Sequence, residues 1–181
     1  DYNDEANESA TSRKGEVTRV GALGKSTANL FKNHNIESMT DWQGSYIDDS
    51  GCSYSADCVE DEAYVGSKAL KVTVNSISKA GGAGAYQTFY TNDGKVQQGK
   101  SYTASAYIKT SGITRSSVVS SSRGCGAALM VKLVAPNGNT RVYTENLQKT
   151  DSNVNNGWER VFVNFTVPND AARVIVWLLV R

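Results

Sequence analysis

Apolar and polar side chains alternate along residues 99–110, the clearest such pattern in the chain. One set comprises Tyr102, Ala104, Ala106 and Ile108, and the other comprises Thr103, Ser105, Tyr107 and Lys109. Because successive side chains of a strand point to opposite faces, a period of two predicts a half-buried antiparallel strand. Its polar face carries a tyrosine and a lysine, which makes it a first candidate for a binding surface. An ordinary solvated strand face explains the pattern equally well.

Similar alternation recurs along the rest of the domain. It places Leu70, Val72 and Val74 on one face of a strand, and it predicts further strands over residues 85–90, 127–134, 141–145, 158–167 and 173–181. The Pro-Asn-Gly-Asn run at residues 136–139 is a strong hairpin-turn signal. No long amphipathic helix is present, so roughly eight or nine short strands predict an all-β antiparallel sandwich.

The N-terminal part of the chain differs in composition from the remainder. Residues 1–10 are acidic and polar, and residues 21–27 have the character of a linker. We therefore expect an N-terminal arm and linker over residues 1–28 and one domain over residues 29–181. Within that domain, the acidic stretch of residues 48–62 is expected to be a loop.

Composition and charge narrow the function. Among 181 residues, 19 are basic and 18 are acidic, and no basic stripe is present, which argues against nucleic acid as a partner. No apolar run is long enough to span a bilayer. The rich supply of Ser, Thr, Asn, Gly and Tyr is typical of extracellular or cell-surface β proteins. The polar start without a signal peptide suggests a processed or excised piece.

The chain has three cysteines, an odd number that cannot all pair with one another. Cys52 and Cys58 bracket a short segment and are expected to close a small disulfide ring in an oxidising compartment, leaving Cys125 over. Spacing alone leaves open whether Cys125 pairs with one of them instead. A zinc site is not favoured, because the single histidine, His34, is distant from the cysteines and no CxxC pair occurs.

Enzymatic interpretations find little support in the sequence. A Ser-His-Asp triad would need His34, but no GxSxG motif accompanies it. A glycosidase needs two opposed carboxylates, and the acidic residues cluster in loops without an indicated pair. We therefore predict that the chain is not an enzyme.

Several segments, taken in order, resemble the jelly-roll carbohydrate-binding modules of the xylanase-associated CBM4/9/22-like group. Residues 29–42 resemble the N-x-x-F-E … W opening of these modules, and residues 66–72 resemble their G-x-x-S-L-x-V strand with Ala69 in place of the usual serine. Residues 86–110 resemble the Q-x-V … G-K-x-Y pair, and residues 158–168 resemble the W-x-x-V-x-x-x-F-T-V-P strand. A Gly-Glu-Val-Thr segment at residues 15–18, together with residues 27–33, also resembles such modules in bacterial wall-associated proteins with RHS/YD repeats.

This resemblance implies a sandwich of jelly-roll type, with one departure. The modules usually end with another strand that carries an aspartate, whereas this sequence stops at Arg181. A sandwich without that strand exposes a backbone edge. We therefore expect a complementing strand, from a partner or a neighbouring chain of the same assembly, to complete the sheet.

The resemblance also implies a structural calcium. Glu37 corresponds to the carboxylate that helps to hold the ion, together with backbone oxygens near Gly66 to Lys68. Calcium prefers such oxygen donors. The aspartate of the final strand is absent, so the set of ligands would be incomplete.

The function implied is non-catalytic binding of a polysaccharide or glycan. Aromatic rings supply apolar faces for sugars and polar groups supply direction. The expected ligand-binding residues are Tyr86, Tyr107, Lys109, Trp42 and Trp177, with Tyr86 and Tyr107 as neighbours on one sheet. Trp177 has apolar neighbours that favour burial, and Trp42 suits the end of the sandwich as well as a cleft. The alternative is a structural, assembly or adhesion domain without a glycan ligand.

Overall fold

The structure is a computed structural model that describes residues 28–48, 50–60, 63–78, 81–113, 126–147 and 157–181. The chain divides into two compact units, Asp1–Leu30 and Phe31–Arg181, and all the described strands belong to the second unit. Within the described ranges, no helix has the length and apolar character needed to cross a membrane.

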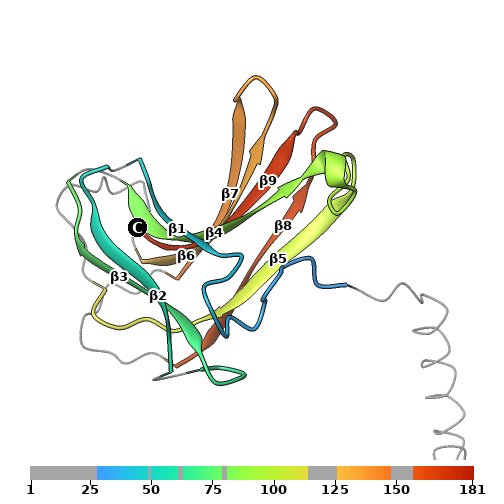
Figure 1. The fold of residues 1–181 in the computed structure, drawn as a ribbon. Helices are drawn as coiled ribbons and strands as arrows, with labels where there is room; N and C mark the ends of the chain where they lie inside the picture. The colour runs from blue at the N-terminus through green and yellow to red at the C-terminus, as the bar shows by residue number, and fades with distance from the viewer. Residues whose placement is uncertain (1–27, 49, 61–62, 79–80, 114–125, 148–156) are drawn as a thin grey trace, which may run out of the picture. The chain divides into compact units, whose positions relative to one another are not determined.

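The regular secondary structure of the described part of this unit is almost entirely β-strand (Figure 1). They are β1 (Gln43–Ile47), β2 (Ser53–Val59), β3 (Ala69–Ser76), β4 (Gly82–Tyr90), β5 (Ser101–Ile108), β6 (Ala127–Val134), β7 (Thr140–Leu147), β8 (Glu159–Thr166) and β9 (Arg173–Val180). A single 3-10 turn, Thr91–Asp93, lies between β4 and β5. Each pairing between these strands is antiparallel.

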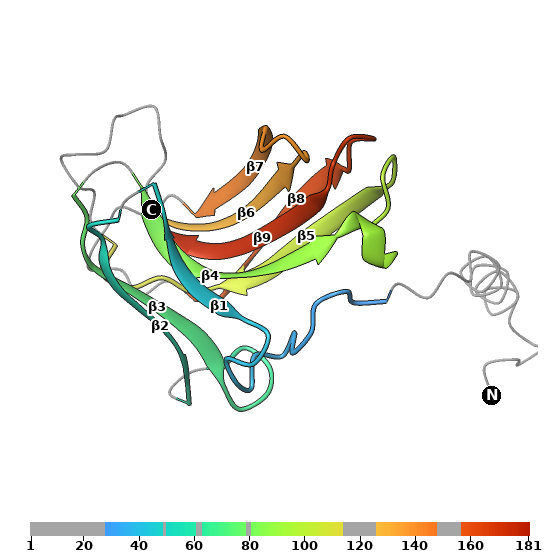
Figure 2. The ribbon, with the colours of Figure 1, turned by 45° about the horizontal axis from the view of Figure 1, so that its top comes forward.

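Five strands form one layer in the order β1-β4-β9-β6-β7 (Figure 2). Strand β9 is central and pairs with β4 on one side and β6 on the other. β9, the last strand that the sequence predicts, therefore pairs with a neighbour on each side and is not an edge strand. β7 is an edge strand of this layer.

The inner face of the five-stranded sheet supplies most of the core. Register places Gln87, Val176 and Val131 in one cross-strand row, and all three are buried. Gln87 is satisfied there, because its amide donates to the Lys32 carbonyl at 2.7 Å and accepts from the Lys32 N–H at 3.2 Å. Burial of a paired amide costs far less than burial of an unpaired one, so this polar residue is compatible with the core.

The other layer consists of two two-stranded antiparallel ladders, β2–β3 and β5–β8, which are separate in the described part of the chain. On β8, Val161, Val163 and Phe165 are at most 7% exposed, and Phe162 on the opposite face is 52% exposed. This is the inward and outward alternation that the sequence predicts for residues 158–167.

The expected antiparallel sandwich is confirmed, but residues 48–62 are not the loop that we predict. β2 occupies most of that stretch and pairs with β3 through Tyr54–Val74, Ala56–Val72 and Cys58–Leu70. The inward residues of β2 are a tyrosine, an alanine and a cysteine, so its apolar period is weak beside the acidic residues around it.

Candidate functional site

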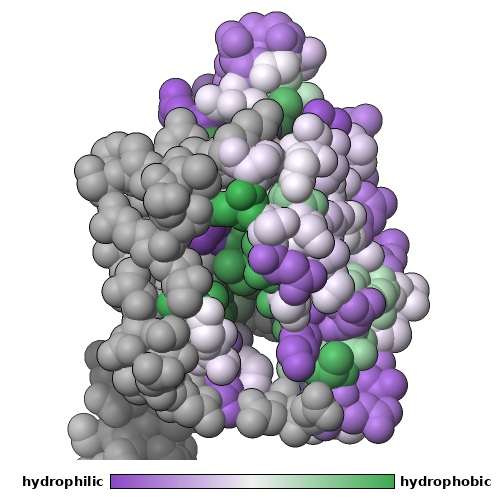
Figure 3. All heavy atoms as spheres, turned by 90° about the vertical axis from the view of Figure 1, so that its left-hand side faces the viewer, coloured by the Kyte–Doolittle hydropathy of each residue, from purple (hydrophilic) through white to green (hydrophobic). Residues whose placement is uncertain are grey.

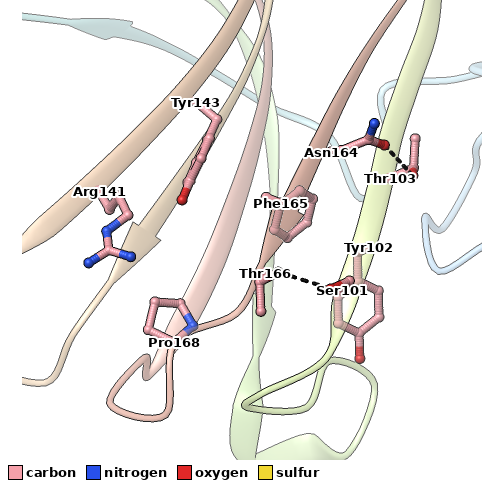
Figure 4. Close-up of a pocket in the computed structure, with 9 residues that line it drawn as sticks. All are labelled: Ser101, Tyr102, Thr103, Arg141, Tyr143, Asn164, Phe165, Thr166 and Pro168. Carbon is pink, nitrogen blue, oxygen red and sulfur yellow. Dashed lines mark hydrogen bonds between the residues drawn. The ribbon is translucent and has the colours of Figure 1, made fainter.

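A groove of about 520 Å³ lies where edge strand β7 meets the two-stranded β5–β8 ladder. Figure 4 shows side chains from the two layers facing each other across it. Its lining residues are Ser101, Tyr102, Thr103, Arg141, Tyr143, Asn164, Phe165, Thr166 and Pro168. Its size falls within the usual range of small-molecule sites, about 300–1,000 Å³.

The β6–β7 hairpin positions one wall of the groove. Its turn is closed by the Gly138 N–H donating to the Ala135 carbonyl at 2.9 Å, and Gly138 has a φ of 84° that favours glycine. Register then pairs Tyr143 with Val131 and Arg141 with Leu133. Arg141 and Tyr143 therefore lie on the inner face of β7, two residues apart, at the edge of the sandwich.

Strands β5 and β8 position the opposite wall. Register pairs Tyr102 with Phe165, and both side chains lie on the inner face of this ladder. The neighbouring pairs, Ser101–Thr166 and Thr103–Asn164, alternate to the outer face, where the hydroxyls of the first pair are 2.9 Å apart and the Thr103 hydroxyl donates to Asn164 Oδ1 at 2.7 Å (Figure 4). These bonds hold the two strands together beside the groove.

Backbone hydrogen bonds next to the Ser101–Thr166 pair keep β5 and β8 in register. The Gly99 N–H donates to the Val167 carbonyl at 2.7 Å, and the Val167 N–H donates to the Lys100 carbonyl at 2.9 Å. Gly99 has a φ of 74°, a conformation that glycine adopts without strain. The Tyr102 hydroxyl accepts the Gln97 N–H at 2.9 Å, which holds its ring at the base of the groove.

The groove therefore combines apolar rings with directional polar groups. Tyr143, Tyr102 and Phe165 supply the rings, and the ring centroids of Tyr102 and Phe165 are 5.9 Å apart. Arg141, on the same face of β7 as Tyr143, supplies N–H donors. Such a set can hold a polyhydroxylated ligand, with a ring against its apolar face and hydrogen bonds to its hydroxyls.

Two of the expected ligand-binding aromatics, Tyr86 and Trp177, lie together outside this groove. They are opposite each other in the β4–β9 register, with ring centroids 4.3 Å apart. Trp177 is 7% exposed and belongs to an apolar cluster on the other face of the five-stranded sheet, with Ala128, Met130 and Leu179. This environment matches the burial that the apolar neighbours of Trp177 favour. Among the residues that the structure describes, none accepts a hydrogen bond from the Trp177 Nε1–H.

The expectation that Tyr86 and Tyr107 are neighbours on one sheet is wrong. Tyr86 lies on β4 in the five-stranded sheet, whereas Tyr107 lies on β5 in the opposite layer. Tyr107 faces outward, is 44% exposed, and stacks on Tyr64 with centroids 3.7 Å apart. Lys109 follows directly after β5 and is half-buried.

Trp42 is a core residue rather than part of a cleft. It is 8% exposed and stacks on Phe31 with centroids 5.7 Å apart and an interplanar angle of 8°. Its Nε1–H donates to the Asn33 carbonyl at 3.1 Å. With one ring face covered and its polar atom satisfied, Trp42 serves packing.

The structure brings Glu37 to the turn that contains Gly66. The Glu37 carboxylate accepts the Ser67 N–H at 2.8 Å and also accepts the Ser67 hydroxyl. These hydrogen bonds hold the pKa of Glu37 below its ordinary value of 4.5. Among the described residues, no group of three or more His, Cys, Asp or Glu side chains is arranged to hold a metal.

Calcium binding at this turn stays a prediction, and the described residues do not fit a full site. Calcium takes six to eight oxygen ligands. Glu37 supplies a single carboxylate, which Ser67 already engages, and Lys68 forms an ion pair with Glu60 at 3.4 Å. We therefore assign the ion no part in the proposed function.

The expected disulfide ring is wrong as well. Cys52 and Cys58 are thiols, and β2 runs between them as an extended strand. At about 3.3 Å per residue, a strand of this length separates the two by roughly 20 Å, far beyond disulfide reach. The Cys58 thiol donates to the Ile36 carbonyl at 3.0 Å, and burial raises its pKa. Cys125 lies outside the described residues.

Sequence reasoning missed the groove. Arg141 and Tyr143 lie in a predicted strand, but their position opposite Phe165 depends on how the two layers pack. A local signal existed for the other wall, because Tyr102 lies on the apolar face of the most regular strand.

Comparisons of the whole chain with known proteins point to a fold and not to a family. No family model matches the sequence, and no curated protein matches it. Among solved structures, the family 16 carbohydrate-binding module 2 is 21% identical with a TM-score of 0.51, covering 83% of this chain and 88% of that one.

Two further structures are similar at lower identity. The CBM22-1–CBM22-2 tandem of Paenibacillus barcinonensis Xyn10C is 16% identical with a TM-score of 0.51, over 82% of this chain and 43% of that chain. The enzymatically active domain of bacteriophage CBA120 tailspike protein 4 is 14% identical with a TM-score of 0.55, over 84% of this chain. The chain spans 19% of that tailspike protein. These likenesses show the jelly-roll type of antiparallel β-sandwich that carbohydrate-binding modules adopt.

Proposed function

We propose that this chain is a non-catalytic glycan-binding module of a secreted or cell-surface bacterial protein, and that its ligand occupies the β7/β5–β8 groove. One observation carries the proposal: Tyr143 and Arg141 on the inner face of β7 line a groove of about 520 Å³ together with the Tyr102 and Phe165 rings of the opposite layer. The similarity of the fold to carbohydrate-binding modules supports the choice of a glycan, because fold alone does not decide function.

The groove sets the expected strength of binding. It is open along one side, so a bound sugar would keep part of its surface in water, and much of the binding energy would offset lost freedom of motion. We expect dissociation constants of roughly micromolar to millimolar, or about −8 to −4 kcal/mol.

The test begins with a glycan array and continues with calorimetric titration of a bound oligosaccharide. Tyr143→Ala is expected to weaken binding by about tenfold, because it removes the ring of one wall. Two matched controls lie elsewhere: Tyr90 is 48% exposed at the end of β4, and Tyr107 is 44% exposed on the outer face of β5. Tyr90→Ala and Tyr107→Ala are expected to bind as the parent does.

The controls also locate a different site. Loss of binding in Tyr107→Ala with unchanged Tyr143→Ala would place the glycan on the outer face of β5, as the strand pattern first suggests. A blank array would remove the glycan proposal altogether.

A second candidate function is an assembly or adhesion domain that is completed by a strand from a partner. The supporting observation is the division of one layer into the β2–β3 and β5–β8 ladders in the described part of the chain. Leu70, Val72 and Val74 on β3 are only half-buried, and Figure 3 shows apolar surface in a hollow on the side where β2 and β3 lie. The free edges of separate two-stranded ladders suit the addition of an extended peptide. A stable, soluble monomer by light scattering would count strongly against this candidate.

A further inference from the structure

The charged side chain of the groove sets it apart from a site for neutral sugars. Arg141 is the one charged residue among those lining the groove that the structure describes, and it is exposed. Within the described ranges, no hydrogen bond or ion pair holds its guanidinium, whereas Lys32 and Lys68 pair with Asp41 and Glu60 at 3.7 Å and 3.4 Å. The Arg141 guanidinium can therefore bind a ligand without first breaking an internal pair.

None of the other residues that line the groove in the described part of the chain is acidic. A guanidinium with no carboxylate among these lining residues favours an anion over a neutral group. The planar guanidinium fork matches a carboxylate with two parallel hydrogen bonds, which a lysine cannot reproduce.

Tyr143 adds the second half of the argument. It is on the same face of β7 as Arg141, two residues further along, so a ring and a positive charge lie side by side on one wall of the groove (Figure 4). One sugar ring can lie against the Tyr143 ring while a carboxylate on it or on its neighbour reaches Arg141.

We propose that the groove is selective for acidic saccharides, in which the carboxylate of a uronic acid pairs with Arg141. This inference rests on the proposed glycan-binding function and names its ligand class. Charge-assisted hydrogen bonds are stronger than neutral ones, so the acidic form of a saccharide is expected to bind about tenfold more tightly than its neutral counterpart.

The test uses pairs of probes that differ in one group. One pair is a xylo-oligosaccharide with a glucuronic acid branch and the same molecule after reduction of its carboxyl group. The other is an oligomer of galacturonic acid and its carboxyl-reduced form. Titrations at pH 7 compare the parent protein with Arg141→Gln, which removes the charge, and Arg141→Lys, which keeps the charge and removes the fork. Arg160→Gln is the matched control, because Arg160 is an exposed arginine on the outer face of β8 and outside the groove.

The inference predicts a preference for the acidic probe in the parent and in Arg160→Gln, and its loss in Arg141→Gln, for which the acidic and neutral probes should bind equally. Arg141→Lys should keep only part of the preference. Raising salt from 0.1 M to 1 M should reduce the preference, because the screening length falls from about 10 Å to about 3 Å.

The failures of the two proposals are distinguishable. Equal binding of the acidic and neutral probes by the parent would overturn the acidic-saccharide inference and leave the glycan-binding function standing. A preference that survives in Arg141→Gln would also overturn it. No binding of either pair, together with a blank array, would remove both proposals.

Discussion

Gly84 lies buried in β4, between Ser45 of β1 and Leu179 of β9. A Cβ built at this position would lie 2.6 Å from Leu179 Cα and 2.8 Å from Leu179 Cβ, and it would collide with the Leu178 carbonyl oxygen. These atoms belong to the central strand of the sheet, which pairs on both sides and cannot move aside cheaply. Gly84→Ala is therefore expected to force β4 and β9 apart.

The expected cost is large for one methyl group. Overpacking typically costs about 1–3 kcal/mol, and we expect the upper end because backbone atoms are the obstacle. Gly44→Ala is the matched control, since its Cβ would meet the Ala56 Cβ at 3.6 Å and the Gly84 carbonyl oxygen at 4.0 Å, both ordinary contacts. Alanine is better than glycine in a strand by roughly 0.5–1 kcal/mol, so the control is expected to be neutral or slightly stabilising.

Urea unfolding separates the two variants. With a slope of about 2 kcal/mol per M, a loss of about 3 kcal/mol lowers the midpoint by roughly 1.5 M for Gly84→Ala. The midpoint of Gly44→Ala should stay at or above that of the parent. Equal midpoints for the two variants would refute the close approach of β4 to β9.

Three further predictions concern stability and reactivity. Leu129 is 1% exposed and Val142 is 49% exposed, so Leu129→Ala should lower the free energy of unfolding by about 2–5 kcal/mol and Val142→Ala by far less, and similar losses would contradict the assigned core. The pKa of Glu37 is lowered in the folded protein, so its stabilisation is present above pH 4.5 and is lost as the pH falls through the folded pKa. The melting temperature of Glu37→Gln should thus lie below that of the parent at pH 7 and converge with it in acid, and a calcium-dependent rise in the parent alone would support the predicted ion. Burial raises the pKa of Cys58, so iodoacetamide should label it more slowly at pH 8 than a small thiol, and equally fast labelling would contradict its burial.

Local alternation was enough to predict most of the strands. Val161, Val163 and Phe165 face inward as expected, and the hairpin turn at residues 136–139 lies between β6 and β7. The same reasoning missed β2, because Tyr54, Ala56 and Cys58 give a faint apolar period among acidic residues. Strands are recognised from the residues they bury, and β2 buries little.

The sites were less predictable because they depend on contacts between layers. Alternation shows which side chains share a face of one strand, but not which strands share a sheet. The chain passes from β4 in one layer to β5 in the other, and this crossing separates Tyr86 from Tyr107. Arg141 and Phe165 line one groove although β7 and β8 are in different sheets, and the pattern of a single strand does not reveal such packing between layers.

The location of the glycan can be measured by an NMR titration. Amide shifts of the labelled chain would be followed as an oligosaccharide from the array is added. If the ligand occupies the groove, the largest shifts fall on Ser101–Thr103, Arg141–Tyr143 and Asn164–Thr166, which surround it. Shifts confined to β1 and β4, or to the outer face around Tyr64 and Tyr107, would show that the glycan binds elsewhere.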